Sequence, residues 1–179
     1  MPHITIGDGN CVARSLATLV YGDENKYHLE MRVRLVHELV VNFKLYLDPL
    51  QLSVGCTNVD SSRILSEMVE LVNDLGSEES FDDPERVVKG IIFRSRILTT
   101  DLTNFHLHAA ANILRLPIVA IYPDRGPARL RNLMKRAFMP DVLPNDYQTL
   151  YVMWYSTRND MNDEYWIPNH MVPLVKIHK

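Results

Sequence analysis

The stretch Gly7-Asp8-Gly9-Asn10-Cys11-Val12-Ala13-Arg14-Ser15-Leu16 holds the pattern that decides the fold. Its glycines and short polar residues predict a turn, and Asp8 or Asn10 can cap the helix that follows. Cys11 therefore falls at or near the first helical turn, where unpaired N–H groups and the helix dipole favour a thiolate over a thiol. A nucleophilic cysteine needs that ionised form, although a cysteine near a helix start is most often only a small buried residue.

Two further stretches extend the pattern along the chain. One is His106-Leu107-His108-Ala109-Ala110-Ala111-Asn112-Ile113-Leu114-Arg115-Leu116-Pro117-Ile118, and the other is Trp166-Ile167-Pro168-Asn169-His170-Met171-Val172-Pro173-Leu174-Val175. With the stretch around Cys11, they resemble the nucleophile motif, the helix-then-strand core and the histidine motif of the ovarian-tumour (OTU) family of cysteine proteases. The three blocks stand in the family's order and span nearly the whole chain, so the set is specific.

The resemblance implies an α+β, papain-like OTU cysteine protease fold, with a small central, mostly antiparallel sheet flanked by helices. It also implies a deubiquitinase that cleaves isopeptide or peptide bonds after the C-terminal glycine of ubiquitin or a ubiquitin-like modifier. Cys11 would attack the scissile carbonyl to form a thioester, and His170 would accept its proton. Asp8 would shape an oxyanion hole in the turn before Cys11. Ubiquitin or a ubiquitin-like protein is the implied partner, and the resemblance implies no cofactor and no metal.

One departure from the family pattern concerns the residue that orients the histidine. Many relatives carry Asp or Asn two residues after it, where this chain has Val172. Asn169 precedes His170 directly, and neighbouring side chains on a strand point to opposite faces. The sequence leaves three possibilities for the group that orients His170: Asp8, a group from the N-terminal segment, or no residue at all. An active enzyme is still expected, since a missing orienter weakens catalysis rather than abolishing it.

Two alternative functions are kept open. The first, motivated by the loss of the usual orienting residue after His170, is a catalytically weak or inactive ubiquitin-binding OTU module. The second is a viral-type protease acting on a polyprotein. Only ten residues precede Cys11, so the chain is either a minimal branch of the family or a piece of a longer protein.

Composition sets the broad class of protein. The chain has 179 residues, of which 46% are hydrophobic and 23% charged, with a net charge of −3 and two cysteines. These values predict a single globular domain over residues 1–179, and we expect a monomer. They disfavour a membrane protein and broad nucleic-acid binding. Because the chain has few cysteines, we expect it in a reducing compartment, either the cytoplasm or the nucleus.

The periodicity predicts helices in the first two thirds of the chain and strands in the last third. An extended segment at Ile4–Ile6 precedes the first helix, which ends near Gly22. Further helices are expected over 25–47, 61–75, 84–92 and 102–114, with an acidic loop over 76–83. The expected strands cover 117–122, 150–154 and 170–177.

Several other residues invite a functional interpretation. Trp166 is expected in the core, where it could also cover the histidine. The Ser156–Asp163 loop is a candidate wall for the tail of the modifier. His106 and His108 lack companions at ligand spacing, which argues against a metal site, and Cys56 is interpreted as structural. The basic residues are interpreted as a solvated face: Arg125, Arg129, Arg131, Lys135 and Arg136.

Overall fold

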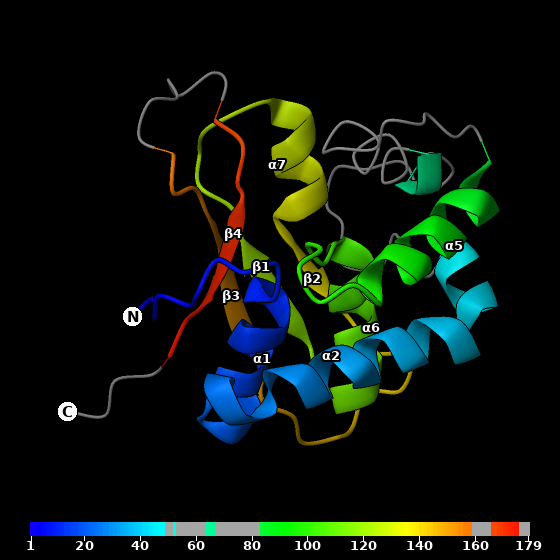
Figure 1. Cartoon of the computed structure of the whole chain (residues 1–179), viewed down its shortest axis with the longest axis horizontal. Coiled ribbons are helices and arrows are strands. Elements are labelled where there is room, and N and C mark those ends of the chain that lie inside the picture. Colours follow the sequence, from blue (N-terminus) through cyan, green and yellow to red (C-terminus); the bar gives the residue numbers. More distant parts are fainter. Residues whose placement is uncertain (49–51, 53–63, 67–82, 159–165, 176–179) are drawn as a thin grey trace.

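The computed structural model describes residues 1–48, 52, 64–66, 83–158 and 166–175 (Figure 1). Helices come first in the chain and strands dominate its last third, as the sequence predicts. The named elements are α1 (Cys11–Tyr21), α2 (Glu24–Val41), η1 (Phe43–Leu47), α5 (Pro84–Ser95), α6 (Asn104–Leu114), β1 (Ile118–Ile121), α7 (Ala128–Met134), β2 (Arg136–Phe138), β3 (Leu150–Tyr155) and β4 (His170–Pro173).

Helix α1 begins at the nucleophile candidate and ends at a glycine. Its apolar face is fully buried through Val12 and Leu16. Gly22 has φ 74°, a left-handed conformation that glycine adopts at low cost, and its N–H donates to the Thr18 carbonyl. Asn10 occupies the N-cap position but makes no side-chain capping hydrogen bond. The predicted helix is confirmed. Of the two residues that the sequence offers as caps, Asn10 makes no capping hydrogen bond, and the Asp8 carboxylate accepts from the backbone N–H of Asn10.

The second helix is shorter than the sequence predicts. Asp23 caps α2 by accepting hydrogen bonds from the backbone N–H groups of Asn25 and Lys26. The helix ends at Val41, and the chain continues as the 3₁₀ helix η1. The tighter winding turns Tyr46 inward, where its hydroxyl donates to Glu38 and accepts from Asn112. A continuous helix over 25–47 is therefore wrong, because tertiary burial of Tyr46 outweighs the helical periodicity.

The sheet has four strands in the order β2-β1-β3-β4. β1 pairs antiparallel with β2 and parallel with β3, while β3 pairs antiparallel with β4. The three predicted strands correspond to β1, β3 and β4, which confirms the mixed class and the mostly antiparallel sheet. Sequence reasoning missed β2 and α7, which lie between β1 and β3 in the chain.

The N-terminal segment runs beside β4, on the edge that β3 leaves open. Pro2 forms an isolated antiparallel bridge with Leu174. The N–H of His3 donates to Pro173 at 3.0 Å, and the N–H of Val175 donates to Met1 at 3.0 Å. Figure 1 shows this blue segment beside the red strand. Residues 1–3 are therefore held against the end of β4, and the extended segment expected at Ile4–Ile6 follows them without forming a strand.

The helices pack in layers on the sheet. α1 packs against β4, α6 packs against β1 and β2, and α2 packs against both of these helices. Thr103 and His106 form a capping box, so α6 begins two residues later than the sequence predicts. Pro84 occupies the first turn of α5, as expected. Most of the helix expected over 61–75 and the loop expected over 76–83 lie outside the described residues.

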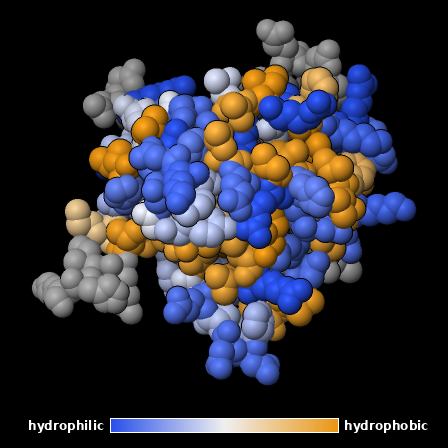
Figure 2. Space-filling model, turned by 60° about the horizontal axis from the view of Figure 1, so that its bottom comes forward, coloured by the Kyte–Doolittle hydropathy of each residue, from blue (hydrophilic) through white to orange (hydrophobic). Residues whose placement is uncertain are grey.

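The surface mixes polar and apolar side chains. Figure 2 shows both kinds side by side on the face that it presents. On α2, the side chains of Leu29, Val33 and Val40 are exposed. Within the described ranges, no helix has both the length and the apolar character that a membrane crossing requires.

Candidate active site

Cys11 lies where the start of α1 meets strand β4. Cys11 is the first residue of α1, and this helix packs against the strand that begins at His170. The turn before Cys11 is fixed by Gly9, which has φ +80°; a Cβ added there would lie 2.3 Å from the carbonyl oxygen of Thr99. Only glycine fits this close approach of two backbone segments. The fold thus brings Cys11 to the strand that carries His170, although the two lie near opposite ends of the chain.

The thiol of Cys11 is buried, with 5% of the residue exposed. Burial is the largest effect on its pKa and raises it, as do the negative charges of Asp101 and Asp8. Backbone hydrogen bonds from Met171 and Val12 lower the pKa but do not compensate, and the resulting value is about 11. The sequence predicts a stabilised thiolate from the helix start, and for the free protein this expectation is wrong. Loss of hydration outweighs the favourable amide dipoles.

His170 is buried and is held by Thr5. Its Nε2 lies 2.9 Å from the Thr5 hydroxyl oxygen and 3.0 Å from the Thr5 carbonyl oxygen. Because a carbonyl oxygen can only accept, Nε2 carries a proton, which leaves Nδ1 as the ring nitrogen that can take up a second one. The Thr5 hydroxyl donates its own hydrogen to the carbonyl of Met171 at 3.0 Å. Of the orienting groups that the sequence left open, the N-terminal segment supplies the one that contacts the ring.

The free edge of the imidazole faces the turn that leads to Cys11. A Cβ added to Gly7 would lie 3.8 Å from Nδ1 of His170, so this nitrogen looks toward the glycine-rich turn. Sequence reasoning named the N-terminal segment but not Thr5. No local motif marks this threonine, because its role depends on the pairing of residues 1–5 with β4.

Asp8 closes the turn rather than contacting the histidine. Its carboxylate pairs with Arg14, with 2.6 Å between Nη2 and Oδ2, and also accepts from the backbone N–H of Asn10 at 3.0 Å. The hydrogen bond from Arg14 is the largest effect that lowers the pKa of Asp8, to about 2. Asp8 is therefore ionised at neutral pH, and its hydrogen bonds run to Arg14 and Asn10. This geometry shapes the turn and leaves the orientation of the ring to Thr5.

Asp101 is a charged neighbour that the sequence reasoning missed. Burial raises its pKa, while the charges of His170 and Arg32 lower it. The same carboxylate raises the pKa of Cys11. Asp101 lies two residues after Thr99, whose backbone packs on Gly9. Tertiary packing therefore decides the position of Asp101 in the site.

Other residues near the histidine have structural contacts. Asn169 accepts from the backbone N–H of Thr157 and donates to its hydroxyl, so it ties two loops and does not orient His170. Val172 is buried. Trp166 is in the core and meets Tyr122 edge-on, with 5.2 Å between ring centroids, which confirms the expected core position. The loop proposed as a wall is described only at 156–158.

The remaining residues that the sequence analysis considered are two arginines of the basic run, Cys56 and the possible metal ligands. Arg136 is 3% exposed and donates to the buried His108 at 3.0 Å, so its assignment to a solvated face is wrong. Arg131 donates to the carbonyl of Gly126. Cys56 lies outside the described residues. Among the residues that the structure does describe, no cluster of three or more His, Cys, Asp or Glu could hold a metal ion.

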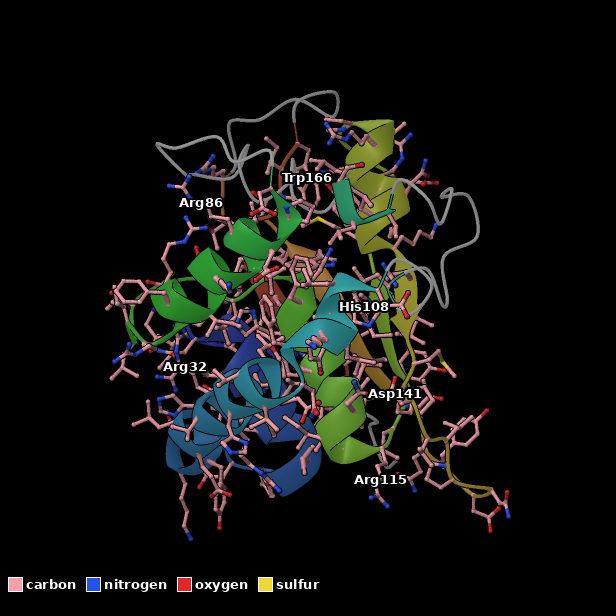
Figure 3. All side chains as sticks on the ribbon, turned by 90° about the vertical axis from the view of Figure 1, so that its right-hand side faces the viewer. Arg32, Arg86, His108, Arg115, Asp141 and Trp166 are labelled. Carbon is pink, nitrogen blue, oxygen red and sulfur yellow. The ribbon has the colours of Figure 1, made fainter. Side chains whose placement is uncertain are left out.

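Figure 3 shows where Trp166 and His108 lie relative to Arg115, the C-cap residue of α6. Trp166 lies near one end of the molecule and Arg115 near the other, with His108 between them.

Comparison with known families gives one match. The family model described as "Vertnin, OTU domain" matches residues 2–155. This span includes Asp8 and Cys11 and ends before His170. A comparison with curated proteins finds no match.

Solved structures show the same fold at low sequence identity. The viral OTU domain protease from Farallon virus is 13% identical, with a TM-score of 0.53 over 99% of this chain and 84% of that chain. The OTU domain of OTUD1 is 17% identical, with a TM-score of 0.49 over 96% of this chain and 83% of that chain. The likeness to the Farallon virus domain supports the fold that the sequence predicts.

Proposed function

Because the chain belongs to the vertnin OTU domain family, and OTU domains are generally deubiquitinating proteases, we propose that it is a cysteine-type deubiquitinase. The contact between Thr5 and His170 carries this proposal. It gives a buried imidazole one protonated nitrogen and one free lone pair, as a general base requires. Ubiquitin or a ubiquitin-like modifier is the proposed substrate.

In the proposed reaction, the Cys11 thiol passes its proton to Nδ1 of His170 as its sulfur attacks the carbonyl carbon of the modifier's C-terminal glycine. The carbonyl oxygen becomes an oxyanion facing the turn before Cys11. The C–N bond breaks as His170 gives its proton to the leaving amine, which leaves a thioester. Water attacks the thioester and His170 takes one proton from it. As the C–S bond breaks, His170 returns that proton to the sulfur and regenerates the thiol, and the released carboxylic acid loses its remaining proton to solvent.

A pKa of about 11 for Cys11 determines how the nucleophile is formed. At neutral pH, little thiolate exists in the free protein, so proton transfer to His170 has to accompany attack. This differs from a preformed thiolate–imidazolium pair. It also makes the Thr5 contact more important, because the ring must be in the accepting tautomer when substrate arrives.

Exposed apolar residues flank the proposed site. Ile6 precedes Gly7 on one side, while Ile97 and Leu98 precede Thr99 on the other, and each of the three is about half exposed. We propose that they hold the extended tail of the modifier. Apolar contacts on both sides of a glycine-rich turn suit an extended peptide that ends in glycine.

Labelling with a ubiquitin derivative whose C-terminus carries a propargyl amide tests the proposal. Intact mass spectrometry should show one covalent adduct on the wild-type protein. The adduct should persist in Cys56→Ala and disappear in Cys11→Ala. Absence of an adduct with the folded wild type, or an adduct that survives in Cys11→Ala, refutes the assignment. Parallel probes built on ubiquitin-like modifiers identify the preferred modifier.

Burial of the thiol supports a second candidate function, a binding module with little or no turnover. A buried cysteine with a raised pKa is what a structural residue shows. Measurable ubiquitin affinity by calorimetry, combined with no cleavage of any ubiquitin linkage, would favour this function over the protease.

A further inference from the structure

Arg32 is a buried cation beside the proposed nucleophile turn. It lies on α2, is only 2% exposed, and points toward the segment that follows α5 (Figure 3). Its guanidinium donates five hydrogen bonds. The acceptors are the carbonyl oxygens of Ser95 (3.0 Å), Gly9 (3.1 Å), Ile97 (2.6 Å) and Thr100 (2.8 Å) and the side-chain oxygen of Asn10 (2.8 Å).

These acceptors belong to two segments that are distant in sequence. One is the turn at residues 9–10, immediately before Cys11, and the other covers residues 95–100. The planar guanidinium offers its five donors in a fixed fork, so each segment is held in one position relative to the other. The same two segments touch at Gly9 and Thr99, where no Cβ fits. Arg32 therefore clamps a contact that the backbones make directly.

The clamp has a consequence for acyl transfer. The Gly9 carbonyl and the Asn10 side chain both face Arg32, which fixes the conformation of the turn that leads into Cys11. Backbone N–H groups stabilise an oxyanion best when they point at it before the reaction begins. We propose that Arg32 is a positioning residue for the reaction: it holds the Gly9–Asn10 turn on the 95–100 segment so that the oxyanion amides are already in place.

This inference rests on the proposed function, and a charge effect is its competitor. Asp8 and Asp101 lie within electrostatic reach of Arg32, as do Cys11 and the buried His106. A cation here could act on the thiol through its charge alone. Lysine keeps the charge but not the fork of donors, so Arg32→Lys separates geometry from charge, and Arg32→Met removes both.

The test compares these variants with Arg34→Lys, a matched control on the same helix. Arg34 is exposed and donates to the Tyr21 hydroxyl. Steady-state kinetics on a ubiquitin–fluorophore conjugate give kcat and KM, and competition gives the affinity for ubiquitin aldehyde, which forms an oxyanion mimic. In Arg32→Lys we expect kcat and aldehyde affinity to fall together by about tenfold or more, with KM changed less than about twofold. Arg34→Lys should match the wild type.

Wild-type kinetics in Arg32→Lys, with a loss only in Arg32→Met, would overturn the proposal in favour of charge. If Arg32→Lys does not fold by circular dichroism, Asn10→Ala removes one acceptor and should lose about threefold in kcat, with KM changed less than about twofold. An unchanged kcat in that folded variant would also overturn the proposal.

Amide hydrogen exchange provides a readout that needs no turnover. In Arg32→Lys, the amides of residues 9–11 and 97–101 should exchange faster together, while in Arg34→Lys they should not. Unchanged exchange overturns the clamp. Faster exchange with unchanged kcat overturns the catalytic role. If the wild type turns over no modifier, the proposed function fails and the catalytic role fails with it, while exchange still decides whether the clamp exists.

Discussion

The histidine is oriented by a threonine in the N-terminal segment. Thr5 presents a hydroxyl and a carbonyl to the same ring nitrogen, so the imidazole has two acceptors at one side. The position two residues after the histidine is Val172, which is buried and has no polar atom in its side chain. The role that many relatives give to a carboxylate or amide on β4 is therefore proposed here for a residue from the opposite end of the chain.

Replacing Thr5 with valine tests this role. The hydroxyl is lost, but the carbonyl remains to hold Nε2, so we expect kcat to fall about tenfold rather than by the larger factor seen when an orienter is lost completely. The carbonyl of Met171 still accepts from Ser15, so stability should fall by about 1 kcal/mol. Kinetics on a ubiquitin–fluorophore conjugate and urea unfolding measure the two effects. Thr5→Ser should restore both, and an equal loss of kcat in that variant would contradict the role.

The reactivity of Cys11 should follow its raised pKa. Since the pKa is about 11, the thiolate fraction should grow about tenfold for each pH unit between 7 and 10. Alkylation by iodoacetamide, followed by mass spectrometry of the peptide that contains Cys11, should show the same dependence. A rate that levels off below pH 8 would mean that the thiol is already ionised and that the burial argument is wrong.

At the scale of elements, the site depends on backbone contacts between segments that are distant in sequence. β4 receives α1 on one side and residues 1–5 along its open edge. The turn before α1 rests on the Thr99 backbone. These contacts place the nucleophile candidate and its base candidate on one rigid framework, so glycine positions matter as much as the reactive groups.

Gly9→Ala tests the backbone contact, and Gly22→Ala is its matched control. Both glycines have positive φ, but a Cβ at Gly9 would overlap the Thr99 carbonyl, whereas a Cβ at Gly22 meets nothing within 4 Å. Gly22→Ala should cost about 1 kcal/mol in urea unfolding, the ordinary cost of a left-handed alanine. Gly9→Ala should cost at least about 2 kcal/mol and abolish labelling by the ubiquitin probe. Equal losses in the two variants would show that the contact at Thr99 does not matter.

Two buried histidines affect the stability of the whole molecule. His106 accepts from the backbone N–H of Thr103 and donates to Ser95, and its pKa is lowered to about 3, first by burial and then by the charge of Arg32. His108 is buried beside Arg136, and its pKa is lowered first by burial and then by the charge of Arg136. Both histidines are therefore neutral in the folded protein and would take up protons on unfolding in mild acid.

The sign of the pH effect follows from these directions. Between pH 6.5 and 4.5 the unfolded chain binds more protons at both histidines, so the free energy of unfolding should fall as pH falls. Each histidine contributes up to about 1.4 kcal/mol per pH unit. The pKa values of Asp101 and Asp141 are raised, and these groups oppose the trend near their ordinary range.

Urea unfolding at pH 4.5, 5.5 and 6.5 measures this slope. His106→Gln should reduce the slope by the amount that one histidine contributes, because glutamine can donate and accept hydrogen bonds but does not titrate. His37→Gln, the same replacement at an exposed position on α2, is the matched control. A slope in His106→Gln equal to that of the wild type would contradict the assignment of His106 as a buried neutral group.

The sequence alone determined the family, the α+β class and most elements. These depend on features that lie within short stretches: helical and strand periodicity, turn glycines, and the motifs around Cys11 and His170. The break at Asn42 and the elements α7 and β2 were missed, since burial and pairing partners decide them.

Only the tertiary structure decided how the proposed site works. It paired residues 1–5 with β4 and so gave Thr5 to the histidine, and it clamped the turn with Arg32. It also reversed the expected shift in the pKa of Cys11. A helix start stabilises a thiolate through local dipoles, but desolvation depends on everything that packs around the sulfur, and residues distant in sequence supply that packing.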